Sequence, residues 1–295
     1  MTTTYDATVR HTGLSFGEAP RWHGGRLWFS DFYRHGIFSL GDDGERLEHT
    51  VATQPSGLGW LADGTLLAVS MTDCAVLAIA PSGAVARHAE LAAYCGHWAN
   101  DMVVARDGTA YVGNFGFALD AWLEEHGPEA LLGEPGPPTA NLVAIAPNGS
   151  ILQVVSEMAF PNGSVLTDDG ATLIVAETFG RRLCAFDVGT DGTLSNRRVF
   201  AQLELVFPDG ICLDAEGQVW VANPAAKECL RVREGGEITA RLETRLTSFA
   251  CMLGGEDRRT LYAITAPSST TSRVANVREG QIESCVVDVP GAGLP

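Results

Sequence analysis

The sequence predicts an all-β protein, a six-bladed β-propeller with four antiparallel strands in each blade. A pattern of two short apolar strands around a turn recurs six times along the 295 residues. Each copy is followed by a second, more polar hairpin. The copies start about 35 to 60 residues apart, and four-stranded units at such intervals are typical of blades around a central channel. We therefore expect one propeller domain over residues 1–295.

The clearest copy of the repeat is the segment 206–223. Asp209 opens it, a short apolar strand follows, and a second strand after the turn at Glu216-Gly217 ends at Asn223. Turn residues between two short apolar runs are typical of a hairpin. The other copies align with it at residues 18–30, 55–69, 99–113, 161–176 and 250–264.

The remaining segments complete the blades. The second hairpins are predicted at residues 36–51, 75–91, 141–155, 182–200, 228–244 and 273–288. Residues 4–11 alternate weakly, and we expect them to close the ring by pairing with a strand near residues 282–287. The Gly- and Pro-rich tail, residues 290–295, is expected to fray.

The alignment also predicts which side chains meet at the axis. The first strand of each blade lines the channel of a propeller, so residues at one register form a ring. The predicted inner ring is Glu18, Ser56, Asn100, Asn162, Asp209 and Ala250. The ends of the second strands form a predicted second ring of Asp31, Ser70, Asn114, Glu177, Asn223 and Thr265, although strand ends that meet solvent are often polar in any case.

Neither ring contains a Lys or Arg residue. Buried carboxylates need a partner, and a hard divalent cation bound by carboxylate and amide oxygens is the natural one here. The sequence therefore predicts a metal in the central channel. Histidine and cysteine spacings give no sign of a zinc site of their own.

Composition limits the partners. A formal net charge of −16 argues against binding to nucleic acid or to an anionic membrane. Residues 1–16 lack the basic start and apolar run of a signal peptide, and no stretch approaches a membrane span. The seven scattered cysteines fit reduced thiols. We expect a cytoplasmic protein with a small-molecule substrate, and the sequence leaves open whether it is a monomer or a homo-oligomer.

One irregularity interrupts the repeat. Residues 116–140 lengthen the third blade, and the segment is either a lid over the channel or a solvated surface loop. As a lid it would place Trp122 beside Phe115 in an apolar wall against the substrate. His97 either faces the channel mouth or is a plain loop residue.

Four motifs in order resemble the SMP-30/gluconolactonase/LRE family of six-bladed propellers. They are Gly-Glu-Ala-Pro-Arg-Trp at 17–22, Ala-Asn-Asp at 99–101, Phe-Pro-Asn-Gly at 160–163 and Phe-Pro-Asp-Gly at 207–210. The resemblance runs over essentially the whole chain. It implies lactone hydrolysis, chiefly of aldonolactones, with one divalent metal held by Glu18, Asn162 and Asp209 and with Asn100 in contact with the substrate. Ca²⁺ is the first expectation for the metal, and Zn²⁺, Mn²⁺, Mg²⁺ and Fe²⁺ remain alternatives.

The chain departs from that family at one position. Sugar-lactone hydrolases of the family commonly have an Arg two residues before the substrate-binding Asn, where this chain has Trp98. An indole offers a flat apolar face in place of several hydrogen-bond donors. This departure favours a lactone or ester with an apolar portion.

The predicted chemistry is polarisation of a lactone carbonyl by the metal and attack by a water that a carboxylate activates. Asp209 is the first candidate for this base, with Asp101 and Glu177 as alternatives. The predicted substrate-binding residues are His97, Trp98, Asn100, Phe115, Trp122 and Glu177. Two other functions stay open: hydrolysis of other esters or phosphotriesters at the same metal, and noncatalytic binding of a metal or metabolite.

Overall fold

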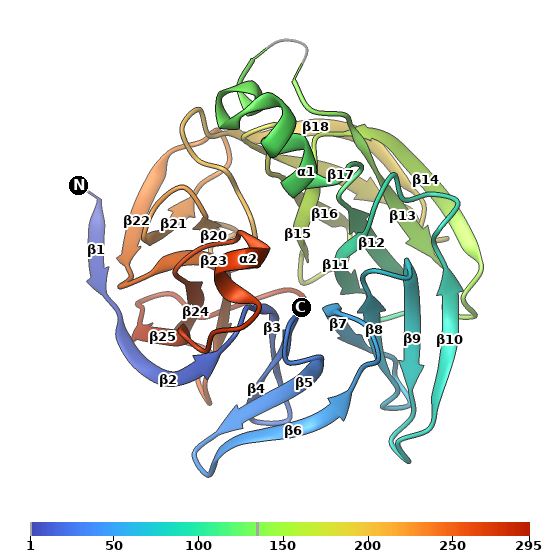
Figure 1. Ribbon diagram of the computed structural model, residues 1–295, viewed down its shortest axis with the longest axis horizontal. Coiled ribbons are helices and arrows are strands. Elements are labelled where there is room, and N and C mark those ends of the chain that lie inside the picture. Colours follow the sequence, from blue (N-terminus) through green and yellow to red (C-terminus); the bar gives the residue numbers. More distant parts are fainter. Residues whose placement is uncertain (1, 134–135) are drawn as a thin grey trace.

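Six β-sheets surround a central axis in the computed structural model, which describes residues 2–133 and 136–295 (Figure 1). The six-bladed all-β propeller predicted from the repeats is confirmed. Blades are numbered here by the order of their innermost strands along the chain. No helix in the described ranges is long and apolar enough to cross a membrane.

The first three blades follow the chain without crossovers. Blade 1 consists of β3 (Gly17–His23), β4 (Arg26–Asp31), β5 (Gly36–Gly41) and β6 (Gly44–Thr50). Blade 2 consists of β7 (Pro55–Trp60), β8 (Leu66–Ser70), β9 (Ala75–Ile79) and β10 (Val85–Glu90). Blade 3 consists of β11 (Ala99–Val104), β12 (Ala110–Asn114), β13 (Ala140–Ile145) and β14 (Ile151–Met158), with α1 (Leu119–His126) and a 3₁₀ helix, η1 (Pro128–Leu131), between β12 and β13.

The last three blades include the ring closure. Blade 4 consists of β15 (Pro161–Leu166), β16 (Thr172–Glu177), β17 (Arg182–Val188) and β18 (Leu194–Gln202). Blade 5 consists of β19 (Ile211–Leu213), β20 (Val219–Asn223), β21 (Glu228–Val232), β22 (Ile238–Glu243) and, at its edge, β1 (Thr3–Asp6). Blade 6 consists of β23 (Thr247–Gly254), β24 (Thr260–Ala266), β25 (Gly280–Val286) and β2 (Thr8–Leu14), with the short helix α2 (Thr271–Val274) before β25.

The core lies between neighbouring blades. Every residue of β8, β11, β12, β15 and β20 is buried, because each inner sheet is covered on both faces by the next blades. One buried cluster, for example, joins Ala19 and Ile37 of blade 1 to Leu58 and Leu66 of blade 2. The outer strand β6, in contrast, has no fully buried residue.

The N-terminal segment closes the ring as predicted, and it also reaches one blade further. Antiparallel pairing joins β2 to β25, with His11 opposite Ile282. The preceding strand β1 then pairs in parallel with β22 of blade 5, which the sequence did not predict. The chain start therefore fastens the last two blades together.

The predicted hairpin at residues 273–288 is wrong in its first half. This segment contains α2 and the single strand β25, while β2 supplies the outer strand of blade 6. A blade closed by the N-terminal strand needs only three strands from the C-terminal part of the chain.

The C-terminal tail does not fray, contrary to prediction. The backbone groups of Leu294 and Leu166 exchange two hydrogen bonds, of 2.8 and 2.9 Å, and Ala292 N–H donates to the carbonyl of Leu213. Gly293 permits this close approach, because its φ is +65° and an added Cβ would lie 2.1 Å from the Leu166 oxygen. The tail thus joins the far ends of β15 and β19, and the C-terminus lies near the axis (Figure 1).

Candidate metal and substrate site

The inner ring is formed by breaks in the ladders of the inner strands. In blade 4, Pro161 pairs with Glu177 and Ser164 pairs with Val175, so two residues, Asn162 and Gly163, stand opposite one. The register also shifts in β3, β7, β11 and β23 at the equivalent point. Such bulges turn a side chain away from its normal alternation. They explain why polar ring residues face the channel although the rest of each strand packs between blades.

Four predicted inner-ring residues do meet in one cavity. Glu18, Asn100, Asn162 and Asp209 all line it. The amide Nδ2 of Asn100 donates to Asn162 Oδ1 at 3.2 Å, and Ser56 Oγ donates to Asn100 Oδ1 at 3.4 Å.

Thr178 holds the second amide of the ring in place. Asn162 Nδ2 donates to Thr178 Oγ1 at 3.2 Å, and that hydroxyl donates to the Pro208 carbonyl at 2.8 Å. These contacts orient both amides, because each nitrogen is committed as a donor.

The two carboxylates of this ring are poorly compensated. Burial raises the pKa of Glu18 well above its usual range, and repulsion from Asp209 and Asp101 adds to the effect. Burial likewise raises the pKa of Asp209, with repulsion from Asp101 as the next cause. Among the described residues that line the cavity there is no Lys or Arg. A buried carboxylate, Asp209, and a partly buried one, Glu18, beside amide oxygens are a donor set that suits a hard divalent cation.

The third acidic residue, Asp101, has a different partner. Its Oδ1 accepts hydrogen bonds from Arg21 Nη2 at 2.7 Å and from the backbone N–H of Met102 at 2.8 Å. Asp101 is buried and does not line the cavity. The structure thus pairs Asp101 with a guanidinium and leaves it outside the cavity lining, and its role as a catalytic base stays a prediction. Consistent with this, the described residues include no group of three His, Cys, Asp or Glu side chains placed to hold a metal.

The predicted second ring does not face the channel. Glu177 is fully buried and binds Arg182 and Arg197 at 3.1 and 2.9 Å, and it also accepts a 2.7 Å hydrogen bond from the N–H of Ala159. Its predicted roles as base and substrate ligand are wrong, because it supports the segment before β15 instead.

The other members of that ring are committed in the same way. Asn114 donates to the Asn141 carbonyl, Asn223 donates to Glu228, and Thr265 donates to Glu283. Asp31 accepts from the backbone N–H of Ser15 at 2.8 Å, and Ser70 bonds to Thr53. The polar residues at these strand ends therefore stabilise the blades through internal hydrogen bonds.

The sixth inner-ring position is also corrected. The predicted Ala250 pairs with Ile264 and lies outside the cavity lining, whereas Phe249, the extra residue of the β23 bulge, lines it. The sequence alignment was one residue out of register because a bulge shifts the alternation. The phenyl side chain of Phe249 thus occupies the sixth position of the otherwise polar inner ring.

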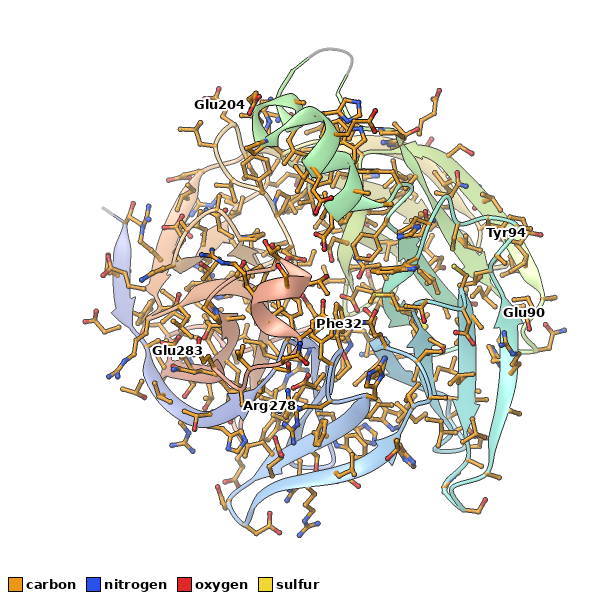
Figure 2. The ribbon with its side chains drawn as sticks, in the orientation of Figure 1. Phe32, Glu90, Tyr94, Glu204, Arg278 and Glu283 are labelled. Carbon is orange, nitrogen blue, oxygen red and sulfur yellow. The ribbon has the colours of Figure 1, made fainter. Side chains whose placement is uncertain are left out.

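Above this ring the cavity is largely aromatic, with a volume of about 510 Å³. One wall, called here the first aromatic wall, is formed by Phe16, Phe32 and Phe249, with ring centroids 5.3 Å (Phe16–Phe32) and 4.8 Å (Phe16–Phe249) apart. Figure 2 shows Phe32 near the centre of the disc, whereas Glu90 and Tyr94 lie at its rim.

The second aromatic wall is formed by Trp98, Phe115 and Phe160, in successive edge-to-face contacts of 6.1 and 4.8 Å. These residues flank inner strands of blades 3 and 4, opposite blades 6 and 1 in the ring order. His97 stacks on Trp98, with ring centroids 4.5 Å apart, and also lines the cavity. Of its two predicted placements, the structure therefore has the one at the channel mouth.

The insertion contributes to the roof of the cavity. Leu119 and Leu123 of α1 and Leu131 of η1 line it. Residues 134 and 135 of the predicted segment 116–140 lie outside the described part of the chain. Trp122 is a correction, because it does not line the cavity but packs on Phe117 at 5.6 Å and on His126 at 4.7 Å.

The roof is completed from blade 6. Thr271 at the start of α2 donates to Asp120 of α1 at 2.8 Å and accepts from the hydroxyl of Tyr33 at 3.1 Å. These three residues line the mouth of the cavity. No local sequence pattern predicts this contact, since the two residues are 151 positions apart.

Known proteins resemble this chain in sequence and in fold. A family model described as the SMP-30/Gluconolactonase/LRE-like region matches residues 16–267. Regucalcin of Gallus gallus is 29% identical over 132 residues, which are 43% of this chain and 44% of that protein. A 6-deoxy-6-sulfogluconolactonase of Pseudomonas putida is 26% identical over 151 residues, 48% of this chain and 51% of that protein. The matched segments thus span about half the length of these relatives.

Among solved structures, a calcium-binding protein, regucalcin, from Agrobacterium tumefaciens superposes with a TM-score of 0.79. It is 20% identical, and the match covers 100% of this chain and 99% of that one. At this identity the likeness supports the fold.

Proposed function

Because the chain belongs to the SMP-30/gluconolactonase/LRE-like family, we propose that it is a divalent-metal-dependent hydrolase that opens lactone rings. The observation that carries the proposal is the pair of carboxylates of the buried Asp209 and the partly buried Glu18, beside two oriented amides at the base of one cavity. A lactonase among the relatives, the 6-deoxy-6-sulfogluconolactonase of Pseudomonas putida, supports the reaction class.

The residues that would hold the metal are Glu18, Asn162 and Asp209, all of which line the cavity and carry side-chain oxygens. Ca²⁺ suits this set best, and Mg²⁺, Mn²⁺, Zn²⁺ or Fe²⁺ are compatible with it. When bound, such a cation supplies Lewis acidity toward a carbonyl oxygen and lowers the cost of the two buried charges.

The base that we propose is Asp209. Of the three carboxylates considered, it alone lines the cavity, while arginines bind the other two. A carboxylate oxygen of Asp209 would take one proton from the attacking water as the water oxygen bonds to the carbonyl carbon. The ring C–O bond then breaks, and that proton passes to the departing alkoxide oxygen, which gives a hydroxy acid.

Asn100 has the role of a positioning ligand. Its amide oxygen and nitrogen are fixed by Ser56 and Asn162, so the Asn100 side chain presents one orientation to the cavity. The remaining N–H of this amide would donate to a substrate oxygen. The aromatic walls and the leucine roof would exclude bulk water, which strengthens these polar contacts.

Elemental analysis of the purified protein together with a pH-indicator screen tests the proposal. The screen covers γ- and δ-lactones, aryl esters and phosphotriesters, before and after chelation. We expect about one divalent metal per chain and acid release from lactones that chelation abolishes and added metal restores.

Two aspartate variants make this test specific. Asp209→Ala should lose more than roughly 99% of the activity, whereas Asp168→Ala, an exposed aspartate in the β15–β16 turn, should keep it. Bound metal without turnover of any substrate would sink the hydrolase proposal in favour of a noncatalytic binding propeller. Preferential turnover of aryl esters or phosphotriesters would replace the lactone class.

A further inference from the structure

We propose that the substrate is a neutral lactone with an alkyl or aryl substituent that lies between the two aromatic walls, and that the site rejects polyhydroxylated and anionic lactones. This inference rests on the proposed function and names its substrate class. It depends on where the cavity offers polar partners and where it does not.

Polar side chains are concentrated at two levels of the cavity. Glu18, Asn100, Asn162 and Asp209 form its base. Tyr33, Asp120 and Thr271 form its mouth, where hydrogen bonds link them to one another. Between the two levels the lining is mainly hydrocarbon, from the two aromatic walls and from Met71, Leu119, Leu123 and Leu131.

A substrate whose carbonyl reaches the base must place its other end against this hydrocarbon. At about 510 Å³ the cavity falls within the size range of sites for drug-sized ligands, roughly 300 to 1,000 Å³. A small unsubstituted lactone would leave most of the cavity unfilled. An alkyl or aryl substituent fills it, with a gain in kcat/KM of about fourfold for each methylene that is buried.

A sugar lactone meets the opposite situation. Its ring hydroxyls would be stripped of water against Phe115 and Phe249, which offer no hydrogen-bonding group, and against Trp98, which offers a single indole N–H donor and no acceptor. Phe249 occupies a position in the inner ring itself, so even the base is apolar on the side of blade 6. Each hydroxyl left without a partner lowers affinity by roughly fivefold to a hundredfold.

An anionic lactone is disfavoured by charge. The charged residues that line the described cavity are Glu18, Asp120 and Asp209, and the lining contains no Lys or Arg. His97 adds no reliable cation at neutral pH, because burial lowers its pKa. With the proposed cation bound, the charges of Glu18 and Asp209 at the base are offset, so a sulfonate or phosphate on the substituent would lie among aromatic rings and Asp120 without a counter-ion of its own. This contrasts with the Pseudomonas putida relative, whose name specifies a sulfo-substituted lactone.

The test compares a matched series of δ-lactones with alkyl substituents of increasing length, glucono-δ-lactone and a sulfonated lactone. For the alkyl series we expect kcat/KM to rise by about fourfold per methylene until the cavity is filled. Glucono-δ-lactone and the sulfonated compound should lie at least about a hundredfold below the best alkyl lactone. Equal or better turnover of either would overturn the inference while leaving the proposed function intact.

Binding of the matching δ-lactams, measured by calorimetry, gives a second readout that needs no turnover. Lactams resist hydrolysis, so their affinities report the cavity alone. Affinity that rises with alkyl length supports the inference, and affinity that is independent of length overturns it. If no lactone is opened, the proposed function fails and the lactam series still decides the question of substrate class.

Two leucines of the insertion provide a matched pair of variants. Leu123 lines the cavity, whereas Leu132 is 55% exposed and does not. Leu123→Asn should flatten the dependence of lactam affinity on alkyl length, and Leu132→Asn should leave it unchanged. Equal effects of both substitutions would count against a substituent that reaches the roof. Trp98→Arg should reduce the ratio of kcat/KM for alkyl lactones to kcat/KM for sugar lactones by at least about tenfold.

Discussion

The guanidinium of Arg21 in blade 1 binds the carboxylate of Asp101 in blade 3 at 2.7 Å, behind the inner ring. The same guanidinium donates to the carbonyls of Leu58 in blade 2 and Met102 in blade 3. One buried arginine thus joins three blades at the level of the site. It also pairs with Asp101, so Glu18 and Asp209 are the carboxylates of this group without an arginine partner among the described residues.

Replacing this arginine should be costly. Arg21→Met leaves the carboxylate of Asp101 buried and unpaired, and we expect a loss of about 3–5 kcal/mol in the free energy of unfolding. Urea denaturation measures the loss. The double variant Arg21→Met/Asp101→Asn should recover more than half of it, because the unpaired charge is then absent. A double variant no more stable than the single one would contradict the assigned pairing.

A divalent cation should stabilise the fold through Glu18 and Asp209. At a Ca²⁺ concentration about a hundredfold above its dissociation constant, the free energy of unfolding should rise by about 2.7 kcal/mol. Thermal melts with and without chelator measure this. Asp209→Asn should remove the increment, whereas the exposed control Asp168→Ala should keep it. Undiminished stabilisation in Asp209→Asn would place the cation elsewhere.

The metal-free protein should lose stability as the pH rises above the ordinary carboxyl pKa, about 4. Glu18 and Asp209 have raised pKa values in the folded state, because burial and mutual repulsion disfavour their charged forms. Between the ordinary and the raised values the folded chain holds more protons than the unfolded chain, so the free energy of unfolding falls with rising pH.

Urea denaturation in chelator across this pH window tests the sign. The variant Glu18→Gln/Asp209→Asn should show a flatter dependence than the wild type. Added Ca²⁺ should oppose the fall, since the cation competes with protons for the same oxygens. A wild-type stability that rises faster with pH than that of the variant would contradict the raised pKa values.

The variant Glu177→Gln should distinguish a structural role of Glu177 from a catalytic one. The substitution keeps an acceptor for the Ala159 N–H but removes the charge that binds Arg182 and Arg197. We expect a loss of about 1–3 kcal/mol in the free energy of unfolding and unchanged calcium stabilisation. The hydrolysis rate should stay within roughly tenfold of wild type, since Glu177 lies outside the cavity. A rate as low as that of Asp209→Ala would restore it as a base.

The repeat made much of the site predictable. Residues such as Asn162 and Asp209 precede Gly in copies of the same hairpin, so alignment alone brought them to one ring. The alignment could not predict the positions at which the hydrogen-bond ladders of the inner strands are interrupted. A one-residue bulge in β23 exchanges Ala250 for Phe249, and nothing in the local sequence marks it.

Long-range partners were the other source of error. Glu177 belonged to a predicted ring and Asp101 directly follows the ring residue Asn100, but the arginines that bind them come from other registers. The tail was also mispredicted because its partner is distant. Leu294 bonds to Leu166, and most of the sequence of blades 4 to 6 lies between these two residues. Periodicity predicts which face a residue occupies, whereas pairing across blades depends on the assembled geometry.

The tail has a kinetic consequence. Because Leu294 pairs with Leu166 at the end of β15 away from Asn162, the tail lies at the opposite end of β15 from the inner ring, and no tail residue borders the described cavity. We expect ligands to enter and leave by one opening, beside α1 and α2. Product that is still bound would exclude the next substrate, so the hydroxy acid should inhibit competitively. Turnover should then be limited by the rate at which product leaves through this opening.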